Sequence, residues 1–281
     1  MLMSMEDFYP SYQQRHNSHN ERNDPTYQPR NSGSTSRSRS GSRPSTLSRP
    51  YGYQNQVESD YCTPACLKAL RDDTFHPGCP NVLYHRSTGA TRETVLKHLE
   101  SDRHYRILAV LGEGRSAGCF SVRTEQGFQL VVKAYKETAA PRLLKPELEV
   151  YNHLAKLQGT AIPVIIGTIH GVFVGDRCNM VYMSYGGVAA ELNPEINDFL
   201  VDRLAKAFTG IHALGVYHED PASRNILIDK DRVTIVDFEN SHILTADDPI
   251  VEQEQTWAME CCHRVKETGQ IKDFKRKDYG E

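Results

Sequence analysis

The chain has 281 residues, which is enough for one large or two small domains, and a formal net charge of −3. This near-neutral balance gives no general nucleic-acid or membrane signature, so a basic partner surface would have to be local. No apolar run approaches the roughly 18 residues that cross a bilayer, and the amino terminus has no apolar core after a basic start. We therefore expect an intracellular protein, cytoplasmic or nuclear, that stays outside the membrane.

Residues 1–55 are poor in aliphatic side chains and rich in Ser, Arg, Asn, Gln and Tyr. Such a segment cannot bury enough apolar surface to offset the entropy of ordering, so we expect a disordered tail. Residues 32–50 contain no acid and four arginines, Arg37, Arg39, Arg43 and Arg49. Two interpretations of them stay open: a plain solvated tail, or a phosphorylatable Ser/Arg segment that binds RNA or an acidic partner.

A cysteine-rich segment follows at residues 56–102. Here Cys62, Cys66, Cys79 and His85 could supply the thiolates and the imidazole of a tetrahedral zinc site. The alternative is reduced cysteines that pack as small hydrophobes, because the spacing is looser than that of compact Cys-x2-Cys pairs. The cysteines of the chain are odd in number and scattered, which favours reduced thiols over a disulfide framework. They are Cys62, Cys66, Cys79, Cys119, Cys178, Cys261 and Cys262.

Two short helices are expected in the same segment. Residues 62–70 should turn Cys66, Leu67 and Leu70 inward. Residues 91–101 should form an amphipathic helix that leads into the next domain, and one face of it carries Val95, Leu96 and Leu99.

Residues 103–281 have the pattern of a second domain. Runs of β-branched and aromatic residues between Gly-containing turns predict an antiparallel sheet, with strands over 105–114, 119–127, 128–135, 164–174 and 179–185. Helical spacing predicts a helix over 142–158, with Leu148, Tyr151 and Leu154 on one side. A longer helix is predicted over 196–214, with Gly215 as its C-cap. Its apolar side consists of Phe199, Leu200, Leu204, Phe208, Ile211 and Leu214.

Residues 215–239 carry the pattern most suggestive of chemistry. His218, Asp220 and Asn225 form a His-x-Asp-x4-Asn loop, followed by apolar strands at 226–228 and 233–236 and then by Asp237-Phe238-Glu239. This order resembles the catalytic loop, hairpin and metal-binding loop of the protein-kinase-like superfamily. The resemblance implies an α+β, two-lobed kinase-like fold and an ATP- and Mg²⁺-dependent phosphotransferase.

The resemblance also assigns roles to individual residues. Asp220 would act as the catalytic base or orient the acceptor hydroxyl, while Asn225 and Asp237 would hold the metal. Lys133 lies on an apolar strand and must find an anion there, because an unpaired buried ammonium is very costly. Its expected partners are the phosphates of ATP and a glutamate of the next helix. Glu147 is the first choice and Glu149, facing roughly the opposite way, is the alternative.

Three further segments would surround the nucleotide. Gly112, Gly114 and Gly118 lie between the first two strands, where glycines let the backbone approach phosphates closely. The third glycine of the family pattern is replaced by Ala117, one position before Gly118. Met183 would lie behind the adenine, and the backbone around Tyr185 would offer hydrogen bonds to it.

The sequence departs from regulated protein kinases in several places. Glu219 stands where an arginine precedes the catalytic aspartate, Ala222 replaces the loop lysine, and Glu239 replaces the glycine after Asp237-Phe238. Residues 240–281 contain no Ala-Pro-Glu motif and one predicted helix at 249–267, so we expect a shortened second lobe. Over 103–260 and in the cysteine pattern, the chain resembles small, truncated fungal kinase-like proteins of unknown substrate.

Three functions remain open at this point. The leading interpretation is transfer of phosphate from ATP to a protein hydroxyl. A kinase that acts on a small molecule, like aminoglycoside or choline kinases, is the second, and Glu239 favours it. The third is a pseudokinase that serves as an interaction module. A nucleic-acid partner is expected only through the Ser/Arg-rich residues 32–50.

Overall fold

The computed structural model describes residues 61–100, 104–114, 116–192, 197–245, 248–250, 253–254 and 256. The chain divides into two compact units, Met1–Val57 with Val174–Asp176, and Glu58–Phe173 with Arg177–Glu281. Of the first unit the structure describes only Val174–Asp176, where Val174 and Gly175 adopt positive φ angles of 53° and 90°. The disorder predicted for residues 1–55 and the Ser/Arg-rich stretch lie outside the described residues.

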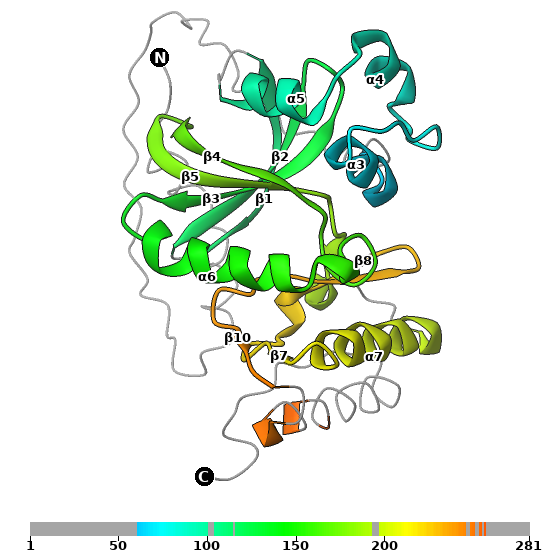
Figure 1. Ribbon diagram of the computed structural model, residues 1–281, viewed down its shortest axis with the longest axis vertical. Coiled ribbons are helices and arrows are strands. Elements are labelled where there is room, and N and C mark those ends of the chain that lie inside the picture. The colour runs from blue at the N-terminus through cyan, green and yellow to red at the C-terminus, as the bar shows by residue number, and fades with distance from the viewer. Residues whose placement is uncertain are drawn as a thin grey trace, which may run out of the picture. The chain divides into compact units, whose positions relative to one another are not determined.

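A five-stranded sheet dominates the second unit, and its strand order is β1-β2-β3-β5-β4 (Figure 1). The strands are β1 (Tyr105–Glu113), β2 (Ala117–Thr124), β3 (Gln129–Lys136), β4 (Ile165–Phe173) and β5 (Asp176–Met183). The pairs β1–β2, β2–β3 and β3–β5 are antiparallel. The predicted α+β class and the predicted antiparallel strands are therefore confirmed, with boundaries shifted by a few residues.

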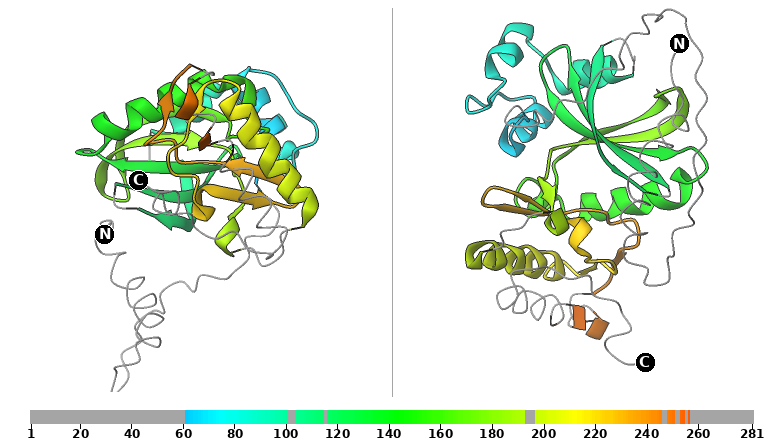
Figure 2. Two further views of the ribbon diagram at one scale, coloured as in Figure 1. Left: turned by 90° about the horizontal axis from the view of Figure 1, so that it is seen from below. Right: turned by 180° about the vertical axis from the view of Figure 1, so that it is seen from behind.

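Three short helices precede the sheet: α3 (Pro64–Arg71), α4 (Val82–Thr88) and α5 (Arg92–Leu99). Thr63 caps α3 by accepting from Cys66 N, and Thr91 and Thr94 form a reciprocal capping box at the start of α5. As predicted, α3 buries Cys66, Leu67 and Leu70, and α5 buries Val95 and Leu99. Helix α3 contacts β4, and α5 contacts β4 and β2, so these helices pack on the sheet (Figure 2).

Helix α6 (Ala140–His153) continues into a 3-10 turn at Ala155–Leu157, and α7 spans Asp198–His212. The predicted inward side of α7 is correct for Leu200, Leu204, Phe208 and Ile211, which are all buried. It is wrong for Phe199, which is 48% exposed with the Arg203 guanidinium 4.9 Å from its ring centre. The predicted Gly215 cap is also wrong, because α7 is capped at Ala213 and Gly215, with φ 72°, lies two residues further on.

The remaining elements are short. They are β6 (Val188–Ala189), a 3-10 turn at Ala190–Leu192, β7 (Val216–Tyr217), a 3-10 turn at Ser223–Asn225, β8 (Ile226–Asp229), β9 (Arg232–Ile235) and β10 (His242–Ile243). The predicted hairpin is confirmed as β8–β9, which pairs in an antiparallel way. One apolar core joins α6, α7 and this hairpin, through buried residues such as Tyr151, Phe208, Ile235 and Phe238.

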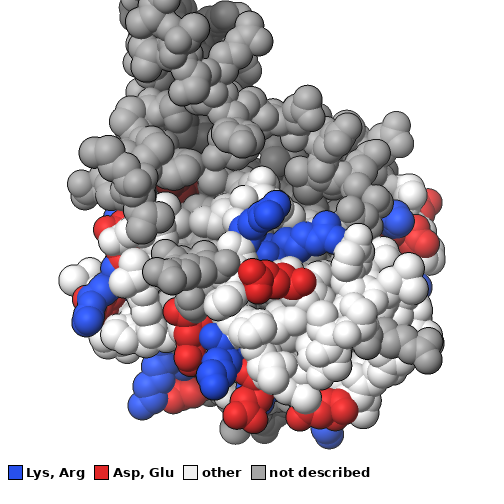
Figure 3. Space-filling model, turned by 90° about the horizontal axis from the view of Figure 1, so that it is seen from above, with Lys and Arg blue, Asp and Glu red and all other residues white. Residues whose placement is uncertain are grey.

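Two sequence-based expectations concern the surface and the carboxyl-terminal part. No helix among the described residues is long and apolar enough to cross a membrane. On the face shown in Figure 3, the described basic and acidic side chains lie beside one another. The helix predicted over 249–267 lies mostly outside the described residues, but Glu254 is among those that the structure places.

Candidate active site

Lys133 lies in the middle of β3, between Cys119 of β2 and Val181 of β5 in the strand register. Only 8% of Lys133 is exposed. Its Nζ donates to Glu147 Oε1 of α6 at 2.9 Å and to Asp237 Oδ1 at 2.5 Å. A buried ammonium needs such carboxylate partners, so the packing of α6 on β3 and the position of Asp237 explain how this strand tolerates a lysine.

The structure distinguishes the two candidate glutamates. Glu147 is 1% exposed, and besides Lys133 it accepts a hydrogen bond from the Tyr135 hydroxyl. Glu149 lies at the surface, where the Lys145 ammonium is 4.0 Å away. A difference of two residues on a helix turns the side chain by roughly 200°, so only one of them can face β3.

The charge state of Lys133 follows from this arrangement. Burial acts to lower the pKa of Lys133, but the Glu147 and Asp237 carboxylates outweigh that effect and raise the pKa well above its usual value. The side chain is therefore a fixed positive charge between two carboxylates.

Asp237 is held in an uncommon backbone conformation. Its φ is 70°, in the left-handed region, and only a few described residues other than glycine share that sign. Residues held there cluster at functional sites, and aspartate tolerates the region better than most. The turn directs the Asp237 carboxylate towards Lys133, directly after strand β9.

The loop before β8 gathers a second set of polar side chains. Asn225 Nδ2 donates to the Asp220 carbonyl at 2.9 Å and to Asp220 Oδ2 at 3.2 Å. Arg224 Nη2 donates to the same Oδ2 at 2.5 Å. Because Nδ2 of Asn225 is used within the loop, its amide oxygen is the atom that Asn225 would offer to a metal.

Backbone hydrogen bonds and contacts between aromatic rings connect the loop that carries Asp220 and Asn225 with the Asp237 turn. Val236 N donates to Asn225 O at 3.0 Å, and His218 Nε2 donates to Val236 O at the same distance. The ring of Phe238 lies 4.7 Å from His218 and 5.2 Å from Tyr151 of α6, measured between ring centres. The loop that carries Asp220 is thereby fixed to the Asp237 turn and to the helix that carries Glu147.

Glu254 is a supporting residue that sequence reasoning did not single out. It is 5% exposed and accepts from His218 N at 2.8 Å and from Glu219 N at 2.9 Å. His212 Nε2 lies 2.8 Å from the same carboxylate. Glu219 has a positive φ of 67°, so Glu254 ties down a strained part of the loop immediately before Asp220.

The glycine-rich turn lies in register with the lysine. Gly112 of β1 is opposite Cys119, which is opposite Lys133, so the three form one row across the sheet. Gly114 N donates to Ala117 O at 2.8 Å and closes the turn, and Gly118 is opposite Ala134. A Cβ added at Gly112 would meet nothing within 4 Å, so the fold itself does not require glycine at this position.

The residues expected near the adenine lie at the end of β5. Met183 is buried opposite Val131, two residues before Lys133. Tyr185 instead stacks on Tyr61, with ring centres 3.8 Å apart, and its carbonyl accepts from Arg232 at 3.0 Å. The side chain of Tyr185 is thus part of the packing between the residues before α3 and the end of β5.

Glu239 places a further carboxylate close to Asp237. Burial raises its pKa, and the Asp237 carboxylate adds to the effect. A glycine at this position would bring no second carboxylate close to Asp237.

The pH dependence of stability should reveal the state of His218. Its Nδ1 accepts from Asp220 N at 3.3 Å and its Nε2 donates to Val236 O, so both ring nitrogens are used by the neutral form. Burial lowers its pKa, and the Glu254 carboxylate only partly offsets this. Below about pH 6.5 the His218 side chain binds a proton in the unfolded chain but stays neutral in the folded one. Protonation of the unfolded state therefore lowers the free energy of unfolding as the pH falls.

We therefore expect the stability advantage of wild type over His218→Gln to shrink between pH 7 and pH 5, since glutamine does not titrate there. Denaturant unfolding of both proteins at the two pH values measures it. An advantage that stays constant or grows towards pH 5 would contradict the neutral, buried state of His218.

The structure thus brings Lys133, Glu147 and Asp237 into direct contact, and Asp220 and Asn225 into a second contact next to them.

No protein-family model matches the chain. An alignment 201 positions long, which covers 65% of the chain, is 29% identical to the meiotic driver SPOK2 of Podospora anserina. The chain spans about a quarter (26%) of the length of that protein.

Proposed function

We propose that this chain is an ATP- and Mg²⁺-dependent phosphotransferase with the two-lobed arrangement of the protein-kinase-like superfamily and a shortened second lobe. The observation that carries the proposal is the buried Lys133, held by Glu147 on one side and by Asp237 on the other. A purely structural ion pair needs one carboxylate for one ammonium. The additional, partly exposed carboxylate of Asp237 is what a metal and phosphate site would use.

The side chains available fit magnesium. Mg²⁺ prefers oxygen ligands, and one or two carboxylates together with substrate phosphates are its usual set. Asp237 supplies a carboxylate and Asn225 an amide oxygen, from segments joined by the Val236–Asn225 hydrogen bond. When bound with ATP, the ion would neutralise phosphate charge during transfer.

The remaining polar groups suit the other tasks of a phosphotransferase. The fixed charge of Lys133 would hold the phosphates, and the glycine turn in the same row of the sheet would lie over them. Asp220 is partly exposed, with Arg224 and Asn225 fixing its Oδ2. It would accept the proton of an incoming hydroxyl, as a general base at this position does.

The proposed acceptor is a protein hydroxyl. Glu239 favours a second candidate, a small-molecule acceptor with a hydroxyl or an amine, because its half-buried carboxylate lies near Asp237 and could bind a polar or cationic group. The name of the relative, a meiotic driver, specifies no chemical step, so the proposed activity rests on the side-chain geometry of this chain.

Transfer of labelled γ-phosphate to a protein extract and to a metabolite extract tests the proposal. Asp220→Asn should lower transfer by about 10²- to 10⁴-fold, the usual contribution of a general base, while ATP binds almost as before. Asp231→Asn, at the exposed turn between β8 and β9, is the matched control and should transfer like wild type.

The destination of the label decides between acceptors. Label in proteins supports the leading candidate, and label in metabolites alone supports the small-molecule candidate. Nucleotide binding without any transfer would identify an interaction module, and equal transfer by wild type and Asp220→Asn would rule out the role of Asp220.

A further inference from the structure

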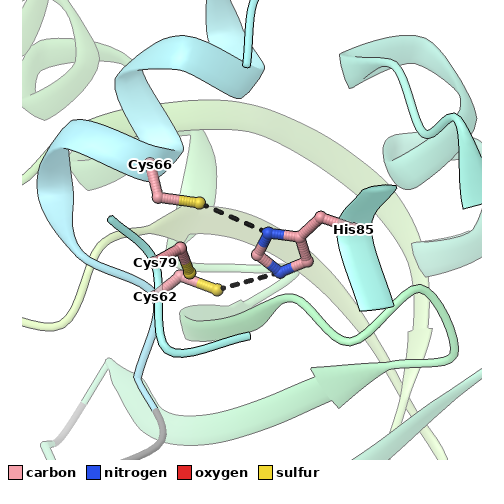
Figure 4. A group of neighbouring side chains, drawn as sticks. All are labelled: Cys62, Cys66, Cys79 and His85. Atoms are coloured by element: carbon pink, nitrogen blue, oxygen red, sulfur yellow. Dashed lines mark hydrogen bonds between the residues drawn. The ribbon is translucent and has the colours of Figure 1, made fainter. Parts of the chain in front are cut away.

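A cluster of three cysteines and one histidine lies outside the site described so far. Cys62, Cys66, Cys79 and His85 point towards one another, and their ligand atoms all lie within 4.8 Å of each other (Figure 4). Their exposed fractions are 1%, 4%, 3% and 7%. We propose that these four side chains form a structural Zn²⁺ site that cross-links the segment 62–85.

The separations match those of a tetrahedral zinc centre. Zinc–sulfur bonds of about 2.3 Å and zinc–nitrogen bonds of about 2.0 Å place sulfur and nitrogen about 3.5 Å apart in a tetrahedron. Cys66 Sγ lies 3.5 Å from His85 Nδ1, which is this separation. Thiolate and imidazole ligands select zinc over magnesium or calcium, which prefer oxygen.

The second shell assigns one nitrogen of His85 to the metal. His85 Nε2 lies 3.3 Å from Gly127 O, the geometry of an N–H donor to a backbone carbonyl. A histidine that binds a metal typically donates its other ring N–H in this way, which fixes the tautomer. Nδ1, which faces Cys66, is therefore the zinc ligand.

Further donors stabilise the charge that the site would carry. Three thiolates around one Zn²⁺ leave a net charge of −1 in a buried place. Gln129 N points at Cys62 Sγ from 3.3 Å, and Asn81 Nδ2 does so from 3.7 Å. Hydrogen bonds from these N–H groups stabilise a negatively charged thiolate. A neutral thiol that only packs as a small hydrophobe gains little from them.

The ligands join separate parts of the chain. Cys62 precedes α3, Cys66 lies in its first turn, Cys79 lies in the loop between α3 and α4, and His85 is on α4. His85 also stacks on Phe128, with ring centres 3.8 Å apart, directly before β3. Such a short, loop-rich segment has little core of its own, so a metal would supply the cross-link that fixes it.

Metal analysis of the purified full chain tests the proposal without any reference to ATP. Wild type should hold about one zinc ion per chain, and Cys79→Ser should hold at least about tenfold less. Cys178→Ser is the matched control, because Cys178 is equally buried but lies on β5, and it should keep its zinc. Equal zinc content in Cys79→Ser and wild type would overturn the assignment.

If Cys79→Ser fails to fold, substitution of Co²⁺ into the wild-type protein tests the metal site instead. Wild-type protein stripped of metal and loaded with Co²⁺ should show the intense visible bands of tetrahedral cobalt and the near-ultraviolet bands of thiolate ligation, and Zn²⁺ should abolish both. Protein that holds no zinc after incubation with it and that gives no such bands has a cluster of reduced thiols and no metal site.

Discussion

Lys133→Ala should destabilise the protein by about 3–5 kcal/mol, because it leaves the carboxylate of Glu147 buried without its cation. Lys145→Ala is the matched control. It removes the ammonium that lies 4.0 Å from Glu149, where both side chains are largely exposed, and should cost less than about 1 kcal/mol. Denaturant unfolding of the two variants gives both values on one scale.

The double variant Lys133→Met with Glu147→Gln distinguishes the cost of an unpaired buried charge from the cost of lost side-chain packing. Both buried charges disappear together, so it should be more stable than Lys133→Met alone. A double variant no more stable than the single one, or equal costs for Lys133→Ala and Lys145→Ala, would contradict the buried ion pair.

Asp237→Asn should lower phosphate transfer by at least about 100-fold, the order expected when one preorganised charge-stabilising group is lost. Asparagine tolerates the left-handed conformation that φ of 70° imposes, and Lys133 keeps Glu147 as its partner. The free energy of unfolding should therefore change far less than it does in Lys133→Ala. Asp237→Asn should therefore lower activity while the protein stays folded.

Titration calorimetry with ATP checks the cause of that loss. For wild type, ATP should bind more tightly with Mg²⁺ than with a chelator, and for Asp237→Asn the difference should vanish. Asp231→Asn should behave like wild type. If Mg²⁺ strengthens ATP binding equally in wild type and in Asp237→Asn, Asp237 is not a metal ligand.

Much of the fold could be predicted from local patterns. The runs of β-branched and aromatic residues between Gly-containing turns indicate the strands of the sheet, and the apolar runs at 226–228 and 233–236 indicate the hairpin β8–β9. The choice of Glu147 followed from helix phase, since Tyr151 and Leu154 on the same side are buried. These features depend on spacing along the chain, and spacing is visible in a sequence.

Other features depend on which segments meet. Phe199 belongs to the apolar series of α7 but lies in its first turn, where it is exposed beside Arg203. Glu254 looks like any polar residue of a predicted helix, and its contacts with His218 N and Glu219 N arise only in the folded chain. The sequence leaves the role of the cysteines open for the same reason, because spacing alone does not show whether Cys79 and His85 come together with Cys62.

The central claim is that ATP phosphates bind at Lys133. An ATP analogue with an acyl group on its terminal phosphate transfers that group to the amine of a lysine that lies against the phosphates, as the ammonium loses a proton and ATP is released. Mass spectrometry of the digested protein locates the label. We expect labelling of Lys133 that excess ATP with Mg²⁺ suppresses, and no comparable labelling of the exposed Lys145. Labelling spread over surface lysines, or unaffected by ATP, would contradict the account.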